Sequence, residues 1–149
     1  MRRLAIVLAM GALVAALVPS TALAGKPTRG ITGASGNTCN APTLLDGWYQ
    51  STFYVTVTYS APHKATQLVV YIDGYWGSST SISGTGSSTV AVGVYQGTGA
   101  GSSFTDAPVT AYLADSSGNV LGGTKTIGSA SADPFASPTT TCSEAIKYP

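Results

Sequence analysis

The stretch STFYVTVTY, residues Ser51 to Tyr59, decides the fold class of this chain. Apolar or aromatic side chains stand at every second position from Phe53 to Tyr59, and Tyr54 and two threonines stand between them. In an extended backbone successive side chains point to opposite faces, so this alternation places the apolar groups on one face. The stretch therefore predicts an amphipathic β-strand.

Turn signals divide the rest of the chain into further short strands. Ser60 to Lys64 forms a turn around Pro62, and Asp115 to Asn119 has the composition of a hairpin turn. Six or seven short strands in a chain of this length predict an all-β fold, an antiparallel two-sheet Ig-like sandwich, with a small barrel as the alternative. Besides the first, the strand-like segments are Gln67–Asp73, Ser79–Ser83, Thr89–Tyr95, Val109–Ala114 and Val120–Ile127.

The composition argues against long amphipathic helices. Only 9% of the residues are charged, and outside the first 24 residues no segment repeats apolar residues at helical spacing. Ser, Thr, Gly, Asn and Gln supply the polarity instead, which is typical of extracellular β-proteins.

The segment from Phe53 to Ile127 resembles bacterial secreted Ig-like and fibronectin type III-like domains. Its strand pattern carries the resemblance, above all Val55 to Tyr59, Leu68 to Gly74 and Val109 to Leu121. The resemblance implies a β-sandwich and says little about function. The two cysteines lie outside these strands, so the inter-sheet disulfide of antibody domains is absent.

The first 24 residues have the pattern of a secretory signal peptide. Arg2 and Arg3 precede an apolar run from Leu4 to Val18, and Ala22 to Ala24 offers an A-x-A cleavage site before Gly25. The apolar run is too short to span a bilayer. We therefore expect a signal peptide over residues 1–24 and a secreted protein without a membrane span.

The mature chain is expected to consist of a lead and one domain. Residues 25–38 are rich in Gly, Ser and Thr around one isolated apolar residue, Ile31, which predicts a flexible lead. Residues 39–149 are then a single β-sandwich domain.

Cys39 and Cys142 are the only cysteines, and in an oxidising environment they predict one disulfide. Two free thiols or half of a metal site are the alternatives.

Charged and ionisable residues point away from several functions. Without Arg2 and Arg3, five scattered basic residues face six acidic ones, a net charge of about −1 that argues against a nucleic-acid or polybasic membrane surface. His63 is the lone histidine and lies in a predicted turn, and no G-x-S-x-G motif occurs. We therefore predict no catalytic residue, no metal site and no cofactor.

Aromatic rings are the one feature of the sequence that suggests a ligand. Tyr75 and Trp76 lie in a glycine-flanked loop, and Tyr54 and Tyr112 are out of phase with the apolar residues of their strands. Exposed rings stack on the faces of sugars, so these four are candidate ligand-binding residues if they share one exposed, coplanar strip. The alternative is that Trp48 and Trp76 cap the two ends of the core.

Three functions remain open from the sequence. The first is a secreted, non-enzymatic binding or structural protein whose partner is an extracellular protein or polysaccharide. The second is a carbohydrate-binding module, because a sandwich with a disulfide between its ends and surface aromatics is similar in layout to such modules, including the family 2 type. The third is a small secreted hydrolase or inhibitor. Uncharged Ser and Thr faces also leave strand edges open to self-association.

Overall fold

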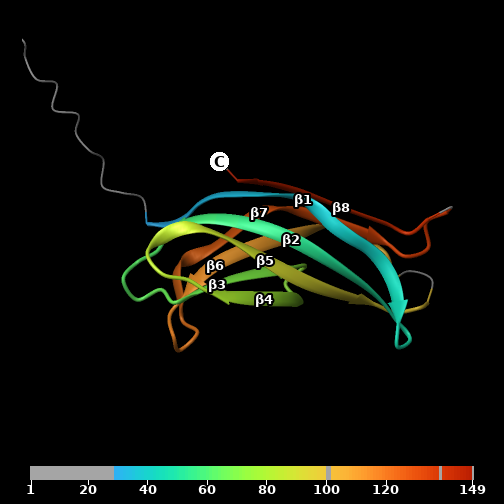
Figure 1. Cartoon of the computed structure of the whole chain (residues 1–149), viewed down its shortest axis with the longest axis horizontal. Coiled ribbons are helices and arrows are strands. Elements are labelled where there is room, and N and C mark those ends of the chain that lie inside the picture. The colour runs from blue at the N-terminus through green and yellow to red at the C-terminus, as the bar shows by residue number, and fades with distance from the viewer. Residues whose placement is uncertain (1–28, 100–101, 138, 149) are drawn as a thin grey trace, which may run out of the picture.

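The computed structural model describes residues 29–99, 102–137 and 139–148. The predicted signal peptide over 1–24, and residues 25–28 of the predicted lead, lie outside these ranges. Within them the chain forms eight β-strands and no helix, which confirms the all-β prediction (Figure 1). The strands are β1 (Gly30–Leu45), β2 (Trp48–Ser60), β3 (Gln67–Ile72), β4 (Trp76–Ser81), β5 (Thr85–Gln96), β6 (Phe104–Ala114), β7 (Val120–Asp133) and β8 (Thr141–Tyr148).

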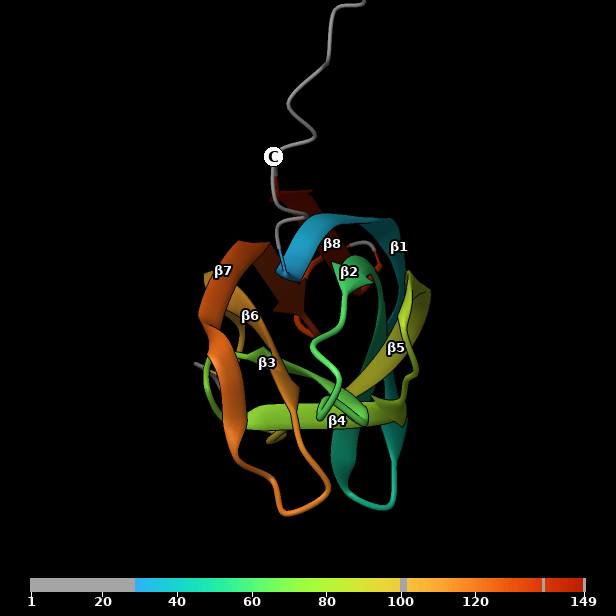
Figure 2. The same ribbon diagram turned by 90° about the vertical axis from the view of Figure 1, so that its left-hand side faces the viewer.

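All eight strands belong to one antiparallel sheet with the order β4-β3-β6-β7-β8-β1-β2-β5. The sheet curls around its own inner face, so that in Figure 2 β5 lies on one side and β6 and β7 lie on the other. The antiparallel prediction is confirmed, but the strands do not separate into two sheets. The reason is that β8 and β1 pair with each other and bridge the two halves. β4 and β5 are the edges of the sheet.

The inner face of the curled sheet forms the hydrophobic core. The alternation in β2 is confirmed, since its apolar residues are buried and Tyr54 between them faces outward. Each predicted strand segment overlaps one of the strands β2 to β7. Burial of a large aliphatic or aromatic side chain contributes about 1.5–3 kcal/mol. The largest fully buried side chains are Phe53, Val55, Val57, Leu68, Val70, Ile72, Val92, Val94, Val109, Leu113 and Ile127.

β1 includes most of the segment that the sequence predicts to be a flexible lead. Residues 30–38 pair with β2 as far as Thr38, which lies opposite Tyr54. Ile31, the isolated apolar residue, is only 7% exposed and belongs to the core. Three register shifts interrupt the pairing of β1 with β2. Such bulges break the alternation that marks a strand, so residues 30–38 are part of the sheet although their sequence does not show it.

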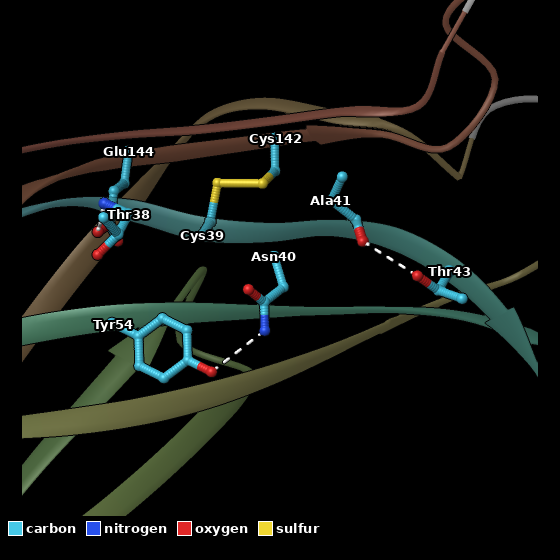
Figure 3. The surroundings of a disulfide bond; sticks show 8 residues. All are labelled: Thr38, Cys39, Asn40, Ala41, Thr43, Tyr54, Cys142 and Glu144. Carbon is cyan, nitrogen blue, oxygen red and sulfur yellow. Dashed lines mark hydrogen bonds between the residues drawn. A yellow bond between two sulfur atoms is a disulfide. The ribbon is translucent and has the colours of Figure 1, made fainter.

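The junction between β1 and β8 depends on a disulfide. The two strands share only three residue pairs, the last of which joins Gly36 to Ile146. Beyond that pair Cys39 and Cys142 are bonded, with Cα atoms 6.2 Å apart, which confirms the predicted disulfide (Figure 3). Disulfides persist in oxidising surroundings, so the fold is typical of a protein outside the reducing cytoplasm.

Two tight turns fix the register of neighbouring strands. The β1–β2 hairpin turns at Asp46 and Gly47, whose φ angles of 50° and 81° fit the type I′ geometry of two-residue hairpins. The predicted hairpin between β6 and β7 is confirmed. There the Asp115 carboxylate accepts hydrogen bonds from the backbone N–H groups of Ser117 and Asn119, both at 2.9 Å.

Candidate functional site

The structure separates the four aromatic residues that the sequence suggests as ligand-binding. Tyr54 lies on the outer face of β2 and is 36% exposed, whereas Tyr112 lies on the outer face of β6, which three strands separate from β2 in the sheet order. Tyr75 is 79% exposed in the turn between β3 and β4. Trp76 begins β4 on its inner face and packs against the core. The four rings therefore do not form one exposed strip.

Trp76 closes one end of the core. Its ring centroid lies 5.4 Å from that of Phe104, which in turn lies 6.2 Å from the ring of buried Phe53. Trp48 does not close the other end, because it is 54% exposed. Substitution of Trp76 is therefore expected to disturb packing, and does not report cleanly on a surface site.

A different set of rings shares one face of the sheet. Trp48 and Tyr54 both point outward from β2, six positions apart, which corresponds to about 20 Å at the usual rise per residue. Tyr95 of β5 lies between them along the sheet, because it pairs with Gln50. Trp48 and Tyr95 are 54% and 53% exposed. We call Trp48, Tyr54 and Tyr95 the aromatic strip.

Neighbouring residues position two rings of the aromatic strip. Asn40 of β1 donates a hydrogen bond from Nδ2 to the Tyr54 hydroxyl at 3.1 Å, and its side chain points away from the disulfide towards Tyr54 (Figure 3). The Tyr95 ring lies beside Gly93, where an added Cβ would be 3.7 Å from it. Ala91 pairs with Tyr54. Because Ala91 and Gly93 are small, no bulky side chain from these two positions projects from the surface between the two tyrosines.

A hollow of about 700 Å³ adjoins the aromatic strip at Tyr54. Hydroxyl groups dominate its lining, and two of them, Thr56 Oγ1 of β2 and Thr89 Oγ1 of β5, are hydrogen-bonded at 2.7 Å. None of the lining residues is charged. The residues around the hollow include Ser35, Gly36, Thr38, Tyr54, Thr56 and Thr89.

A β-bulge in β1 shapes this hollow. The pairing of β1 with β2 shifts register between Ser35 and Thr38, and Gly36 lies within the shift. A Cβ at Gly36 would approach Glu144 Oε1 to 2.9 Å and the Tyr54 carbonyl oxygen to 3.0 Å, closer than side chains normally pack. Glycine is therefore the residue that fits at this point of the bulge, where it lines the hollow.

Glu144 supports the bulge from β8. Its Oε1 atom accepts a hydrogen bond from the Thr38 backbone N–H at 2.9 Å. Its Oε2 atom is buried and has no hydrogen-bond partner among the described residues. Burial raises the pKa of Glu144, and the hydrogen bond from Thr38 opposes that rise. Glu144 does not line the hollow, so we assign it to the strand junction.

The chemistry of this face suits binding of an uncharged ligand. Flat rings and hydroxyl groups lie side by side, with no charged side chain among the residues of the strip or the lining of the hollow. Several carboxylates are engaged elsewhere in backbone hydrogen bonds, including those of Asp115, Asp133 and Glu144. In the described ranges, no three His, Cys, Asp or Glu side chains gather as metal ligands would.

No protein-family model matches this chain, and no curated protein or solved structure is significantly similar to it. The part of the chain that the structure describes also contains no helix long and apolar enough to cross a membrane. Function is therefore inferred from the chemistry of the aromatic strip and the hollow.

The sequence prediction missed two of the three residues of the aromatic strip, although a signal for them exists. Trp48 lies an even number of positions from Tyr54 and an odd number from buried Phe53, so in a regular strand it is on the same face as Tyr54. Tyr95 is likewise out of phase with buried Val94. Extending the alternation of each strand to its end places both rings on the outer face. That β2 and β5 are neighbours, which joins the rings into one strip, follows only from the topology.

Proposed function

We propose that this chain is a secreted, non-enzymatic domain that binds a neutral polysaccharide on the outer face of β1, β2 and β5. The aromatic strip is the observation that carries the proposal. Its three exposed rings stand on neighbouring strands of a rigid sheet, and aromatic rings stack on the apolar faces of sugars through many small dispersion contacts. The hollow beside Tyr54 adds hydroxyl groups that can exchange hydrogen bonds with a sugar chain.

The uncharged rings of the aromatic strip and the hydroxyl groups of the hollow favour a neutral ligand, such as a glucan or chitin. An acidic polysaccharide calls for cationic side chains, and neither the strip nor the lining of the hollow supplies one. Threonine, serine and tyrosine hydroxyls bind sugar hydroxyls without the cost of burying a charge. A few polar groups beside apolar surface are the usual composition of a small-molecule site.

Two features support secretion. Residues 1–24 have the pattern of a signal peptide, and the Cys39–Cys142 disulfide fits an oxidising compartment. A domain that leaves the cell meets polysaccharides of cell walls and of the surroundings.

We also propose that the curled sheet is a variant of the Ig-like sandwich. Strands β4-β3-β6-β7 form one half and β8-β1-β2-β5 form the other. Leu68 from the first half and Phe53 from the second belong to one buried cluster, as in a sandwich whose two layers share a core. Continuous pairing through β7, β8 and β1 joins the halves.

A structural role through self-association is the second candidate function. β5 is a sheet edge of 12 residues, and its sequence from Thr85 to Gln96 contains no charged residue and no proline. Such residues normally protect an edge from pairing with another chain. Sedimentation of the secreted protein over a range of concentrations tests this role. A concentration-dependent dimer supports it, and a monomer throughout rules it out.

Binding to insoluble polysaccharides tests the leading proposal. The secreted protein is mixed with cellulose, chitin and starch granules, beside a Tyr54→Ala, Tyr95→Ala variant. Tyr75→Ala is the matched control. Tyr75 is more exposed than any ring of the aromatic strip, but it lies away from the strip in the turn between β3 and β4. Both substitutions of the double variant lie on the surface, so its fold should be retained.

The wild type and Tyr75→Ala should bind one of the three polysaccharides equally well. The double variant should lose about 30-fold in affinity, since two stacking contacts of about 1 kcal/mol each are removed. Equal binding by the double variant and the wild type would place the site elsewhere. Failure of the folded wild type to bind any of the three would remove the support for a polysaccharide ligand.

A further inference from the structure

A second pair of aromatic rings lies on the outer face of β3 and β6. The ring centroids of Tyr71 and Tyr112 are 6.2 Å apart, and the ring planes differ by 17°. They are diagonal neighbours across two paired strands, because Tyr112 pairs with Val69 and Tyr71 pairs with Thr110. The two rings are therefore nearly parallel neighbours on one face of the sheet.

The surroundings show that these rings lie over the sheet. A Cβ added at Gly77 of β4 would collide with the Tyr71 ring, so that ring fills the space above Gly77. Val69 points outward between Tyr71 and its partner Tyr112, yet it is only 9% exposed and lies outside the core cluster. The two rings account for its burial. We call Tyr71 and Tyr112 the tyrosine platform.

Uncharged polar groups surround the tyrosine platform. A hollow of about 260 Å³ on this face is lined by both tyrosines and by Gln67, Gly77 and Ser79, none of which is charged. Tyrosine hydroxyls are protonated at neutral pH and can donate hydrogen bonds, and burial, followed by the influence of Tyr71, raises the pKa of Tyr112 further. Flat rings beside an amide and hydroxyls repeat the chemistry of the aromatic strip.

We infer that the tyrosine platform is a second site for a neutral polysaccharide, and that the domain is therefore bivalent. The inference rests on the proposed function for its class of ligand. Strands β7, β8 and β1 separate β6 from β2 in the sheet order, and Figure 2 shows β6 and β5 on opposite sides of the curl. One short stretch of a sugar chain therefore cannot lie on both surfaces at once. Each domain therefore holds two chains, or two parts of one chain, which raises avidity.

Calorimetric stoichiometry tests the inference, with cellohexaose, chitohexaose and maltohexaose as the probes. The wild type should bind two molecules of one of these hexaoses per chain. The Tyr54→Ala, Tyr95→Ala variant and the Tyr71→Ala, Tyr112→Ala variant should each bind one. Gly77→Ala is a finer probe, because it keeps both tyrosines and displaces only the Tyr71 ring. It should weaken one of the two sites about fivefold or more and leave the other unchanged.

Each result distinguishes the two sites, provided that thermal melting shows each variant to be folded. One hexaose per wild-type chain, lost in the Tyr54, Tyr95 variant and kept in the Tyr71, Tyr112 variant, overturns the inference and leaves the proposed function intact. Binding lost only in the Tyr71, Tyr112 variant supports the platform and contradicts the proposed site on β2 and β5. No binding of any hexaose overturns both.

Discussion

Asn40 of β1 and Tyr54 of β2 are joined by a hydrogen bond of 3.1 Å from the Asn40 amide to the Tyr54 hydroxyl. The bond crosses two neighbouring strands on the outer face and limits how the Tyr54 ring can turn. Tyr54 is the residue at which the aromatic strip meets the hollow, so its orientation affects both. A ring that is already oriented loses less entropy when a sugar stacks on it.

Asn40→Ala should weaken polysaccharide binding about fivefold and leave the fold intact. The expected loss corresponds to about 1 kcal/mol, the usual net contribution of one hydrogen bond. The site is exposed, so the free energy of unfolding should change by less than about 0.5 kcal/mol. Asn40→Asp is the control, because its carboxylate can accept a hydrogen bond from the Tyr54 hydroxyl and should restore most of the affinity. Equal affinity of Asn40→Ala and wild type would show that the hydrogen bond does not position the ring.

Gly36→Ala should destabilise the protein by about 1–3 kcal/mol, the usual cost of overpacking. Its methyl group would approach Glu144 Oε1 to 2.9 Å and a backbone oxygen to 3.0 Å. Gly33→Ala is the matched control on the same strand, because its methyl group would make an ordinary contact of 3.6 Å with Thr58. Urea unfolding of both variants measures the difference. Similar stability of the two would mean that the bulge does not require glycine.

Loss of the disulfide should cost about 2–5 kcal/mol of unfolding free energy. In Cys39→Ser, Cys142→Ser the junction of β1 and β8 keeps only three residue pairs and the hydrogen bond from Thr38 to Glu144. In this variant, the amide protons at the junction of β1 and β8 should therefore exchange faster than those of β2 and β3. Urea unfolding combined with hydrogen exchange measures both effects, and reduced wild type should match the variant. Unchanged exchange at this junction would contradict its dependence on the disulfide.

Glu144 should make the protein less stable as the pH rises from about 4 to 7. Burial raises its pKa in the folded state, so the folded state favours the protonated form. The contribution of Glu144 is therefore greatest below its ordinary pKa and declines as the pH rises through the raised value. Glu144→Gln cannot ionise and keeps an oxygen for the Thr38 N–H, so it should gain stability relative to wild type over this range.

Urea unfolding of wild type and Glu144→Gln at several pH values measures that gain. Other titrating groups are common to both proteins, so their effects cancel in the difference. Asp115 is one of them, since hydrogen bonds from Asn119 lower its pKa and give it the opposite pH dependence. A difference that stays constant or shrinks with rising pH would contradict the account of Glu144.

The sequence predicts the strands in the middle of the chain well, and it predicts the strands at the two ends of the chain poorly. In β2 and β5 every second residue is apolar, which predicts the inner face of each strand. Val55, Val57 and Val92 are among these residues, and all three are buried. β1 and β8 contribute Ile31 and Ile146 as their buried aliphatic anchors, and bulges disturb the period of β1. Backbone pairing and the disulfide help to hold these two strands in place.

The candidate site was only partly predictable for a related reason. The alternation of side chains along a strand predicts which face a ring occupies, as it does for Tyr54 and Tyr112. It does not predict which strands are neighbours. The order of strands sets Tyr95 beside β2 and Tyr112 on the far side of the curl. Trp76 shows the limit of a local argument, because its glycine-flanked position suggests exposure while its ring packs on Phe104.

An NMR titration with the hexaose that binds is the most direct test of the central claim, that the outer face of β1, β2 and β5 holds a neutral polysaccharide. Amide signals of Asn40, Tyr54 and Tyr95 should shift in a saturable manner, and those of the turn from Asp115 to Asn119 should not. Signals of the tyrosine platform should shift as well if the domain is bivalent. The account would be contradicted if Tyr54 and Tyr95 stayed unchanged at saturation while residues elsewhere responded.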